Sequence, residues 1–310
     1  MRLLISILLF TVLFSCETSV KKQETAPKPK IEKIQEIMEY SPEIIADPID
    51  PLLYETSGLI FYEGLLWSVN DSDNKPEIHG VDPETGMVQK TILIENHPNI
   101  DWEDIAQDDQ YIYVGDFGNN SGARKNLKIL KIKKNDINES DYQSVDAEDI
   151  CFMYSDQDDF SVRWDRSRFD CEAMTIFKGK IYIFSKDWQN ENTRWYTIPD
   201  STGIQNVKPS REFDAEGLVT GADCYKDKII ALCGYKNFVP FIWLFFDFEN
   251  DNFTDGSSIR LNLLDIAGAQ VEGITFINDS TLVISNENSG VEQRLLKVSL
   301  AELGIFPLKN

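Results

Sequence analysis

One short pattern occurs five times along this chain and constrains its fold more than any other feature. In each copy a glutamate stands at or just before a small, polar or acidic residue, and an apolar run follows. A polar turn then leads into a second apolar run that ends in a polar cluster. The repeated glutamates lie 44 to 69 residues apart and are Glu55, Glu103, Glu172, Glu216 and Glu272. Because repeats of about 40 to 50 residues are typical of propeller blades, the pattern predicts a β-propeller.

The strand content supports this fold class. Long amphipathic helical stretches are absent from the sequence after residue 42, and short alternating or β-branched runs bounded by Gly, Asp and Asn recur instead. Two further strands are expected in each of the first four copies, at residues 77–81 with 87–94, 127–132 with 149–154, 194–198 with 206–213, and 241–248 with 258–263.

The fifth copy has only one further strand, at residues 294–298, so we expect a strand near residues 43–48 to complete it. That arrangement would close the ring and remove its exposed edges. We therefore predict an all-β propeller of four-stranded antiparallel blades, five in number. Six blades are the alternative, if the long interval before Asp170 hides another one.

Hairpin geometry brings the repeated polar residues to one face. In an antiparallel hairpin the start of the first strand and the end of the second strand lie together, away from the turn. First strands line the central axis of a propeller, so the five glutamates are expected to surround that axis at one mouth. The second-strand endings and the residues beside them would add Asp71, Asp73, Asp104, Asp116, Asn119, Asn120, Lys186, Asp187, Asn286 and Glu287.

Five carboxylates around a narrow axis repel one another unless they are protonated, paired or neutralised by a cation. Calcium takes six to eight oxygen ligands, which this inventory supplies, whereas zinc sites need the nitrogen and sulfur donors that a chain with two histidines largely lacks. The predicted Ca²⁺ ligands are Glu55, Glu103, Glu172, Glu216, Glu272 and Asn286. Each glutamate has the alternative role of capping backbone amides between blades.

A calcium loop of the EF-hand type is excluded for the segment that starts at Asp71. Lys75 and Pro76 occupy the places where that loop needs a ligand and a glycine.

Ligand-binding and catalytic candidates come from the same face. Basic residues are scarce, so Lys186 and Arg124 beside several acids are either ion-pair partners or clamps for an anionic group of a ligand. The ligand-binding candidates are Asp71, Asp73, Asp116, Asn119, Asn120, Arg124, Lys186 and Tyr235. The catalytic candidates are Glu103, Asp104, Glu216 and Lys186. Trp102 and Trp188 lie within polar motifs, whereas the other tryptophans are expected in the core between blades.

The N-terminal residues have the pattern of an export signal. Arg2 precedes an uncharged run over residues 3–15, which is too short to span a bilayer but fits the apolar part of a signal peptide. Leu13-Phe14-Ser15-Cys16 resembles the bacterial lipoprotein cleavage box, in which the cysteine becomes the acylated first residue. An ordinary signal peptide with a free Cys16 is the alternative. We predict a signal peptide over residues 1–15, a flexible tether over 16–42 and one propeller domain over 43–310.

Charge and cysteine content narrow the partners and the location. The 52 Asp and Glu residues outnumber the 30 Lys and Arg residues, and a net charge of -22 disfavours nucleic acid. We expect a monomer in the bacterial cell envelope, joined to a lipid membrane through acylated Cys16. The outer membrane is favoured, and the face is left open.

The other cysteines are expected either to form disulfides or to stay as buried thiols, and they are Cys151, Cys171, Cys224 and Cys233. A turn at residues 226–227 would place Cys224 opposite about Ile229, so Cys224 and Cys233 are not expected to be cross-strand neighbours.

The motif Asp101-Trp102-Glu103-Asp104-Ile105-Ala106, followed by Gly115-Asp116-Phe117-Gly118-Asn119-Asn120, resembles a signature of exported bacterial propeller proteins. The similarity covers about residues 54–300. More distantly, the chain is similar to SdiA-regulated propellers, esterase-like phytase propellers and the gluconolactonase group. In the gluconolactonase group a Glu of a Glu-Gly motif, an Asn and an Asp bind calcium, and Glu216, Glu272 and Asn286 match those residue types here. No full lactonase pattern is present, so the resemblance does not carry that chemistry.

Two functions of different classes follow. In the first, an envelope lipoprotein uses an acidic calcium site to bind a small molecule or another envelope protein. In the second, calcium polarises a lactone, ester or phosphate oxygen while a carboxylate acts as general base. The absence of Gly-x-Ser-x-Gly and Cys-x-x-Cys disfavours serine esterases and thiol redox enzymes. Propellers host both binding proteins and hydrolases, so the sequence leaves the choice open.

Overall fold

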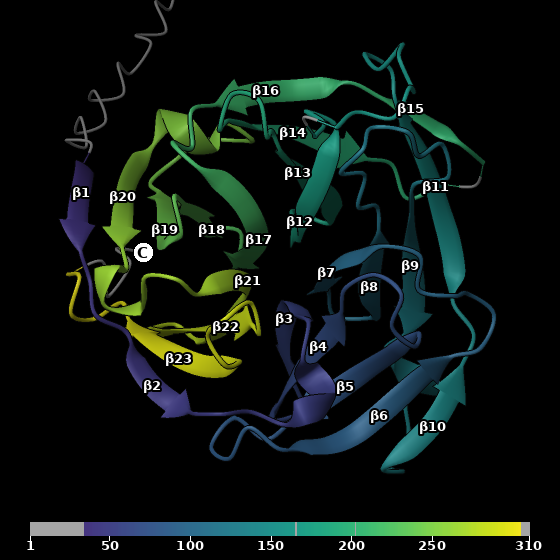
Figure 1. The fold of residues 1–310 in the computed structure, drawn as a ribbon, viewed down its shortest axis with the longest axis horizontal. Helices are drawn as coiled ribbons and strands as arrows, with labels where there is room; N and C mark the ends of the chain where they lie inside the picture. Colours follow the sequence, from purple (N-terminus) through teal and green to yellow (C-terminus); the bar gives the residue numbers. More distant parts are fainter. Residues whose placement is uncertain (1–33, 165, 202, 305–310) are drawn as a thin grey trace, which may run out of the picture. The chain divides into compact units, whose positions relative to one another are not determined.

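The computed structural model describes residues 34–164, 166–201 and 203–304, which form five β-sheets around a central axis (Figure 1). The predicted signal peptide, Cys16 and the predicted tether up to residue 33 lie outside the described residues. The five-bladed, all-β propeller is confirmed. Between residue 154 and Asp170 the described residues contain no strand, and the strands earlier in that interval belong to the five sheets, so it does not hide a sixth blade.

Each blade contains four antiparallel strands, counted from the axis outward. Blade 1 is β3 (Thr56–Tyr62), β4 (Leu65–Asn70), β5 (Glu77–Val81) and β6 (Val88–Ile94). Blade 2 is β7 (Trp102–Gln107), β8 (Tyr111–Asp116), β9 (Lys128–Lys133) and β11 (Glu148–Tyr154). Blade 3 is β12 (Asp170–Phe177), β13 (Lys180–Lys186), β14 (Thr193–Ile198) and β16 (Pro209–Phe213).

Blade 4 is β17 (Leu218–Tyr225), β18 (Ile229–Lys236), β19 (Val239–Phe246) and β20 (Ser257–Asn262). Blade 5 is β21 (Gln270–Asn278), β22 (Thr281–Glu287), β23 (Arg294–Ser299) and β2 (Glu43–Ala46). The N-terminal strand β2 pairs antiparallel with β23 and closes the ring, as predicted. The short 3-10 helices are η1 (Pro51–Leu53), η2 (Lys134–Asp136), η3 (Phe253–Asp255) and η4 (Leu264–Ile266).

Three blades carry a fifth strand that the sequence did not predict. These strands are β1 (Gln35–Glu39), β10 (Tyr142–Val145) and β15 (Gln205–Val207), and they pair in parallel with β20, β6 and β11. Along the chain, each of these strands comes directly before the fourth strand of one blade. It pairs, however, with the outer strand of the blade before that one. The pair β1 and β2 fits this rule, because blade 5 takes its outer strand from the start of the chain. The folded part therefore begins before residue 43, and residues 35–39 of the predicted tether form a strand.

Apolar side chains fill the space between neighbouring blades. The described residues form five buried clusters, one for each pair of neighbours. Trp67 of blade 1 and Trp102 of blade 2 share one cluster, and they are 1% and 0% exposed. Complete burial of a large apolar side chain stabilises a fold by about 1.5–3 kcal/mol. Trp102 is therefore a core residue, although its neighbours in the sequence are polar.

The four described cysteines are free thiols. Cys224 lies opposite Ile230, one residue from the expected partner, and Cys233 lies opposite Gly221. The two sulfurs are therefore not cross-strand neighbours, in agreement with the prediction. Among the described residues, no helix has the length and apolar character needed to cross a membrane.

Candidate functional site

Beta-bulges near the start of the first strands decide which side chains reach the axis. The pairing of first and second strands shifts by one residue at Glu103, Glu172, Thr220 and Glu272. In blade 1 the shift falls between Ser57 and Ile60. A bulge leaves its extra residue outside the ladder and re-aims its side chain. The axial positions are therefore occupied by three glutamates and two hydroxyl residues.

This arrangement corrects the predicted ring of five glutamates. Glu55 and Glu216 precede their first strands, so neither occupies the bulge. Glu55 accepts a hydrogen bond from Asn74 Nδ2 at 2.6 Å. Glu216 is exposed, and its backbone carbonyl accepts a bond from Arg260 at 3.3 Å. The corresponding positions are Ser57, which directly precedes the irregularity in blade 1, and Thr220, which occupies the bulge of blade 4.

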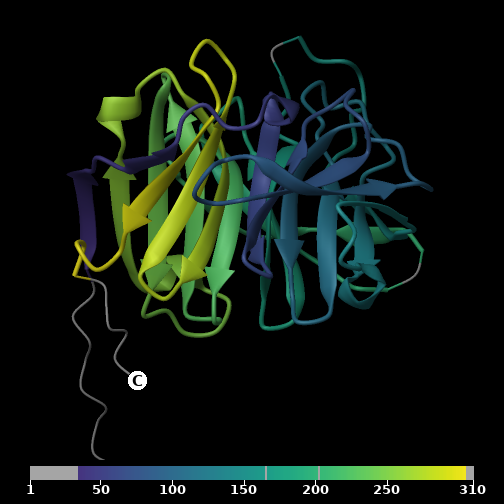
Figure 2. The ribbon, with the colours of Figure 1, turned by 90° about the horizontal axis from the view of Figure 1, so that it is seen from below.

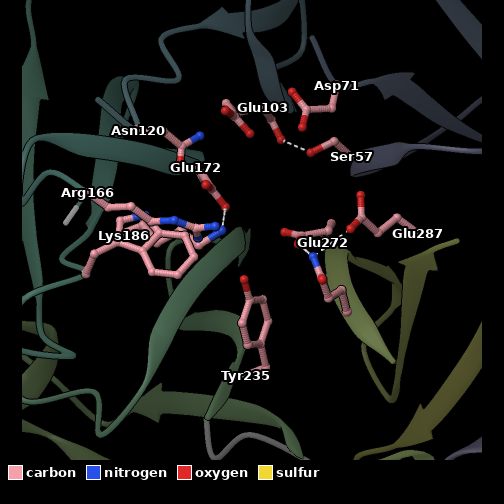
Figure 3. Close-up of a pocket in the computed structure, with 12 residues that line it drawn as sticks. Ser57, Asp71, Glu103, Asn120, Arg166, Glu172, Lys186, Tyr235, Glu272 and Glu287 are labelled. Atoms are coloured by element: carbon pink, nitrogen blue, oxygen red, sulfur yellow. Dashed lines mark hydrogen bonds and ion pairs between the residues drawn. The ribbon is translucent and has the colours of Figure 1, made fainter. Parts of the chain in front are cut away.

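Ser57, Glu103, Glu172 and Glu272 open into a polar cavity of about 220 Å³ on the axis, which we term the axial cavity (Figure 3), whereas Thr220 does not line it. Carboxylates predominate in its lining. The lining residues are Ser57, Asp71, Glu103, Asn120, Arg166, Glu172, Lys186, Trp188, Tyr235, Gln270, Glu272 and Glu287. These residues come from all five blades, so the cavity exists only in the closed ring.

Glu103 is the central acid of the axial cavity. It is 4% exposed, and its Oε1 has no hydrogen-bond partner among the described residues. Gly118 permits the backbone to pass close by, because a Cβ there would lie 2.0 Å from Oε1. Burial, followed by the charge of Asp71, raises the pKa of Glu103 well above its ordinary value. A buried carboxylate without a donor needs a proton or a cation.

Two groups of three carboxylates converge on Glu103. One contains Asp71, Asp101 and Glu103, and the other contains Glu103, Asp170 and Glu172. In each group the ligand atoms lie within 4.8 Å of one another.

Asp170 and Glu172 are already compensated by donors. Asp170 accepts hydrogen bonds from Asn119 N at 2.7 Å and Trp188 Nε1 at 2.8 Å, and Glu172 forms an ion pair with Lys186. Asp71 and Asp101 are less compensated, since Asp71 accepts from its neighbour Ser72 N and Asp101 lies 3.7 Å from Arg124 Nη1. The group of Asp71, Asp101 and Glu103 is therefore the one that lacks positive charge.

The pKa of Asp101 reflects this deficit. Burial, with Asp71 next, raises it to about 7 despite the opposing effect of Arg124. At neutral pH the group thus shares protons or attracts a cation.

Lys186 is the buried cation of the axial cavity. Its Nζ contacts Glu172 and lies 4.7 Å and 5.3 Å from the ring centroids of Trp188 and Tyr235. Burial lowers the pKa of Lys186, but Glu172 and Glu272 outweigh burial and hold it well above its ordinary value. Lys186 therefore remains charged and is committed to Glu172, which favours the ion-pair role over the anion clamp.

Glu272 and Glu287 form a separate acidic pair on the wall contributed by blade 5 (Figure 3). Gln270 Nε2 joins them, at 3.3 Å from Glu272 Oε1 and 2.5 Å from Glu287 Oε1. Burial raises the pKa of Glu272 to about 8 against the opposing effect of Lys186. Burial, followed by Asp71, raises the pKa of Glu287 to about 7. Both groups therefore exchange protons near neutral pH.

Several predicted ligand residues hold the loop beside the axial cavity instead of lining it. Arg124 forms an ion pair with Asp116 at 2.7 Å and donates to Gly118 O at 2.8 Å. Asn119 Oδ1 accepts from Arg124 N at 2.9 Å. These bonds fix the segment that carries Asn120, which does line the cavity. The ion-pair role of Arg124 is thus the one that the structure shows.

The remaining predicted residues lie elsewhere. Asp104 is buried and accepts backbone bonds from Met174 and Ile105. Asp187 accepts from Gln189 N and Asn190 N in a turn, and Asp73 is exposed. Asn286 is buried and donates to the carbonyls of Glu287 and Glu292. These four residues do not line the axial cavity.

The sequence analysis missed Ser57, Arg166 and Gln270 as cavity residues. One signal for Ser57 was available, because a glycine directly follows the axial residue in Ser57-Gly58, Thr220-Gly221 and Glu272-Gly273. Alignment of the repeats on that glycine, instead of on every glutamate, would have identified the hydroxyl positions. Arg166 lies in a loop, where no repeat pattern marks it.

Comparisons with known proteins assign the chain to no family. No protein-family model and no curated protein matches it. A solved glucose dehydrogenase is 9% identical, with 84% of this chain and 99% of that chain covered and a TM-score of 0.49. A calcium-binding protein, regucalcin, from Agrobacterium tumefaciens is 11% identical, with 86% of this chain and 96% of that chain covered and a TM-score of 0.45. A glycosyl hydrolase from Bacteroides ovatus is 10% identical, with 84% of this chain and 94% of that chain covered and a TM-score of 0.46.

These identities and scores are too low to transfer an activity. Membership of the exported propeller family therefore stays a prediction.

Proposed function

We propose that this protein is an exported binding protein whose axial cavity holds a divalent cation, with calcium as the ion that the donors fit best. The observation that carries the proposal is the buried, unpartnered Oε1 of Glu103 beside Asp71 and Asp101. Calcium prefers carboxylate and other oxygen ligands, and it tolerates irregular geometry. Asp71, Asp101 and Glu103 would hold the ion, and Ser57 and Asn120 supply further oxygen atoms at the cavity wall.

The charge balance of the axial cavity supports this proposal. Five lining residues carry carboxylates, while Lys186 and Arg166 are its cations, and Lys186 is committed to Glu172. A divalent ion relieves the mutual repulsion that otherwise requires protonation. Bound calcium would therefore lower the pKa of its carboxylate ligands and stabilise the fold.

Calcium-dependent thermal stability tests the proposal. The purified full chain is expected to melt at a higher temperature in calcium than in chelator, since a ligand at about 100 times its Kd stabilises a fold by about 2.7 kcal/mol. Glu103→Gln keeps the shape but removes the charge and is expected to abolish the calcium shift. Glu216→Gln is the matched control, because Glu216 is a repeated glutamate outside the cavity. An undiminished calcium shift in Glu103→Gln would contradict the site.

A second candidate function is metal-dependent hydrolysis of a lactone, ester or phosphoester. It is favoured by Glu272 and Glu287, whose pKa values of about 8 and about 7 suit proton transfer at neutral pH. One ionised carboxylate of the pair would accept a proton from water as the water oxygen attacks, and the protonated partner would donate to the leaving oxygen. Calcium would supply polarisation of the carbonyl or phosphoryl oxygen.

Turnover measurements separate this candidate from simple binding. A panel of lactones, aryl esters and phosphoesters is expected to show calcium-dependent hydrolysis that Glu272→Gln lowers by about 100-fold, the usual contribution of a general base. A binding protein would hydrolyse none of them, and Glu249→Gln, in the turn after β19, serves as the exposed control.

We also propose that acylated Cys16 joins the protein to a lipid membrane of the bacterial envelope. The described chain enters the propeller through β1, which is parallel to β20 and so starts on the face opposite the cavity mouth (Figure 2). The described chain therefore begins at the face away from the cavity. Mass spectrometry of the mature N-terminus is expected to find a lipid on Cys16, and Cys16→Ala is expected to move the protein into the soluble fraction. An unmodified Cys16 would contradict anchoring.

A further inference from the structure

The loop between β11 and β12 brings an arginine to the axial cavity. It carries Arg163, Arg166 and Arg168 in a chain where acids outnumber basic residues by 52 to 30. Arg163 pairs with Asp159 at 3.2 Å, and Arg168 lies 3.9 Å from Asp187. Arg166 forms no ion pair with any carboxylate among the described residues, and it is the arginine that lines the cavity.

The guanidinium of Arg166 is held in place by stacking. Its Cζ lies 3.6 Å from the ring centroid of Trp188, and the Trp188 Nε1 donates to Asp170 at 2.8 Å (Figure 3). Stacking engages the flat face of a guanidinium and leaves the N–H donors at its edge available. A planar donor edge at a cavity wall matches the two oxygens of a carboxylate or phosphate.

The surrounding carboxylates decide when an anion can enter. Without a cation, an incoming anion meets the carboxyl groups of Asp71, Glu103 and Glu272, which offer it no positive partner and repel it wherever they are ionised. With a divalent ion at Glu103, the same anion gains a second positive partner across the cavity. Anion and cation must then strengthen each other's binding by the same factor.

We infer that the ligand of this site carries a carboxylate or phosphate group, and that Arg166 on Trp188 binds this group together with the cation. The inference rests on the proposed cation site, and it adds the chemical class of the ligand. Arg166 is the residue that determines specificity, whereas Glu103 holds the ion.

Calorimetric titrations of the full chain test the inference. Methyl phosphate and acetate serve as probes, so the two arms show whether phosphate or carboxylate is preferred. At least one probe is expected to bind the calcium-loaded protein and to lose at least tenfold in affinity in chelator. Arg166→Ala is expected to weaken the anion at least tenfold, because hydrogen bonds to charged groups are the strong ones. Arg166→Lys keeps the charge without the planar edge. Its affinity for the anion is expected to lie between those of the parent and Arg166→Ala.

Calcium titrations separate failure of the inference from failure of the proposed function. Arg166→Ala is expected to bind calcium as well as the parent, and Arg163→Ala, from the same loop, is expected to bind both calcium and anion normally. If calcium binds but neither probe does, or if Arg166→Ala keeps full anion affinity, the inference is wrong and the cation site stands. If calcium does not bind the parent protein, the proposed function is wrong and the inference falls with it.

Discussion

Two sets of buried carboxylates lie on the inner strands, and they differ in the donors around them. The mouth carboxylates, Glu103 and Glu272, line the axial cavity, and Glu103 Oε1 has no partner among the described residues. The deep carboxylates, Asp104 and Asp223, lie farther along β7 and β17 and are bonded to backbone amides. The two sets share the carboxyl group, and Glu103, Glu272 and Asp104 are buried while Asp223 is half-buried. The comparison therefore teaches that donors, rather than burial, distinguish structural acids from candidate ligands.

The pKa values follow this contrast for Asp223 and Glu272 but not for Asp104, whose pKa burial raises well above its ordinary value despite hydrogen bonds from Met174 and Ile105. Burial raises the pKa of Asp223 to about 6, although hydrogen bonds from Phe276 and Cys224 oppose it. Burial raises the pKa of Glu272 to about 8, with a weaker hydrogen bond from Gln270. Backbone donors substitute for water around a buried anion, so they limit the shift.

Asp104→Ala is expected to have the largest effect on stability. It leaves the amides of Met174 and Ile105 without their acceptor, and unpaired buried groups cost about 1–3 kcal/mol each, or about 2–6 kcal/mol in total. Urea denaturation in chelator measures the loss. Glu103→Gln is the mouth counterpart and is expected to change the free energy of unfolding by less than about 1 kcal/mol, because no donor is lost. Equal losses of unfolding free energy in Asp104→Ala and Glu103→Gln would show that hydrogen-bond donors do not distinguish the two sets of carboxylates.

Gly58→Ala is expected to be the next most harmful change. Gly58 has φ +66°, and a Cβ there would lie 2.6 Å from Ile105 N and 2.4 Å from Asp104 Oδ1. Left-handed backbone costs a non-glycine residue about 1–2 kcal/mol, and overpacking adds about 1–3 kcal/mol. Gly64→Ala is the matched control, with φ +80° and nothing within 4 Å. A similar loss of unfolding free energy in both variants would show that deep packing does not contribute.

The pH dependence of stability is expected to come mainly from the mouth. The folded-state pKa of Glu272 is raised from 4.5 to about 8, so the native state binds protons that the unfolded state has released. The free energy of unfolding should therefore fall by up to about 1.4 kcal/mol per pH unit as the pH rises from about 4.5 to about 8. Chemical denaturation at several pH values measures this slope in chelator.

Two comparisons sharpen the pH prediction. Glu272→Gln removes the titrating group and is expected to flatten the slope. Calcium favours the ionised carboxylates and is expected to flatten it as well. An identical slope for the parent and Glu272→Gln would assign the effect to other groups.

Thr220→Val is expected to have the smallest effect. It removes the hydrogen bond from Thr220 Oγ1 to Val271 O at 2.5 Å but keeps the side-chain shape, so a loss of about 1 kcal/mol is expected. The calcium shift should be unchanged, since Thr220 occupies an axial position without a charge. Loss of the calcium shift in this variant would mean that Thr220 serves the cation as well as Ser57.

Most of the fold was predictable because propeller repeats are local patterns. The first two strands of each blade follow from apolar runs and turns, and β2 was expected because blade 5 lacked an edge strand. The parallel strands β1, β10 and β15 were not predictable, because short polar segments such as Gln35–Glu39 are held by pairing with another blade. Their amino acids alone do not favour a strand.

The candidate site was predictable only in part. Asp71, Glu103, Glu172, Lys186, Tyr235 and Glu272 were expected at the axis and do line the cavity. Glu55 and Glu216 resemble Glu103 in sequence but precede their bulges, and a one-residue register shift cannot be read from a local motif. Arg166 depends on where a loop places its side chain over Trp188.

By itself, the sequence determined the five-bladed propeller and the acidic character of its mouth, because spacing, apolar periodicity and charge are properties of the chain. Only the tertiary structure decided which carboxylates remain without donors. That outcome depends on bulges, on amides that neighbouring blades contribute, and on the cations Lys186 and Arg166 that converge on Trp188 from two segments. These relations join residues that are distant in sequence, so they exist only when the ring is closed.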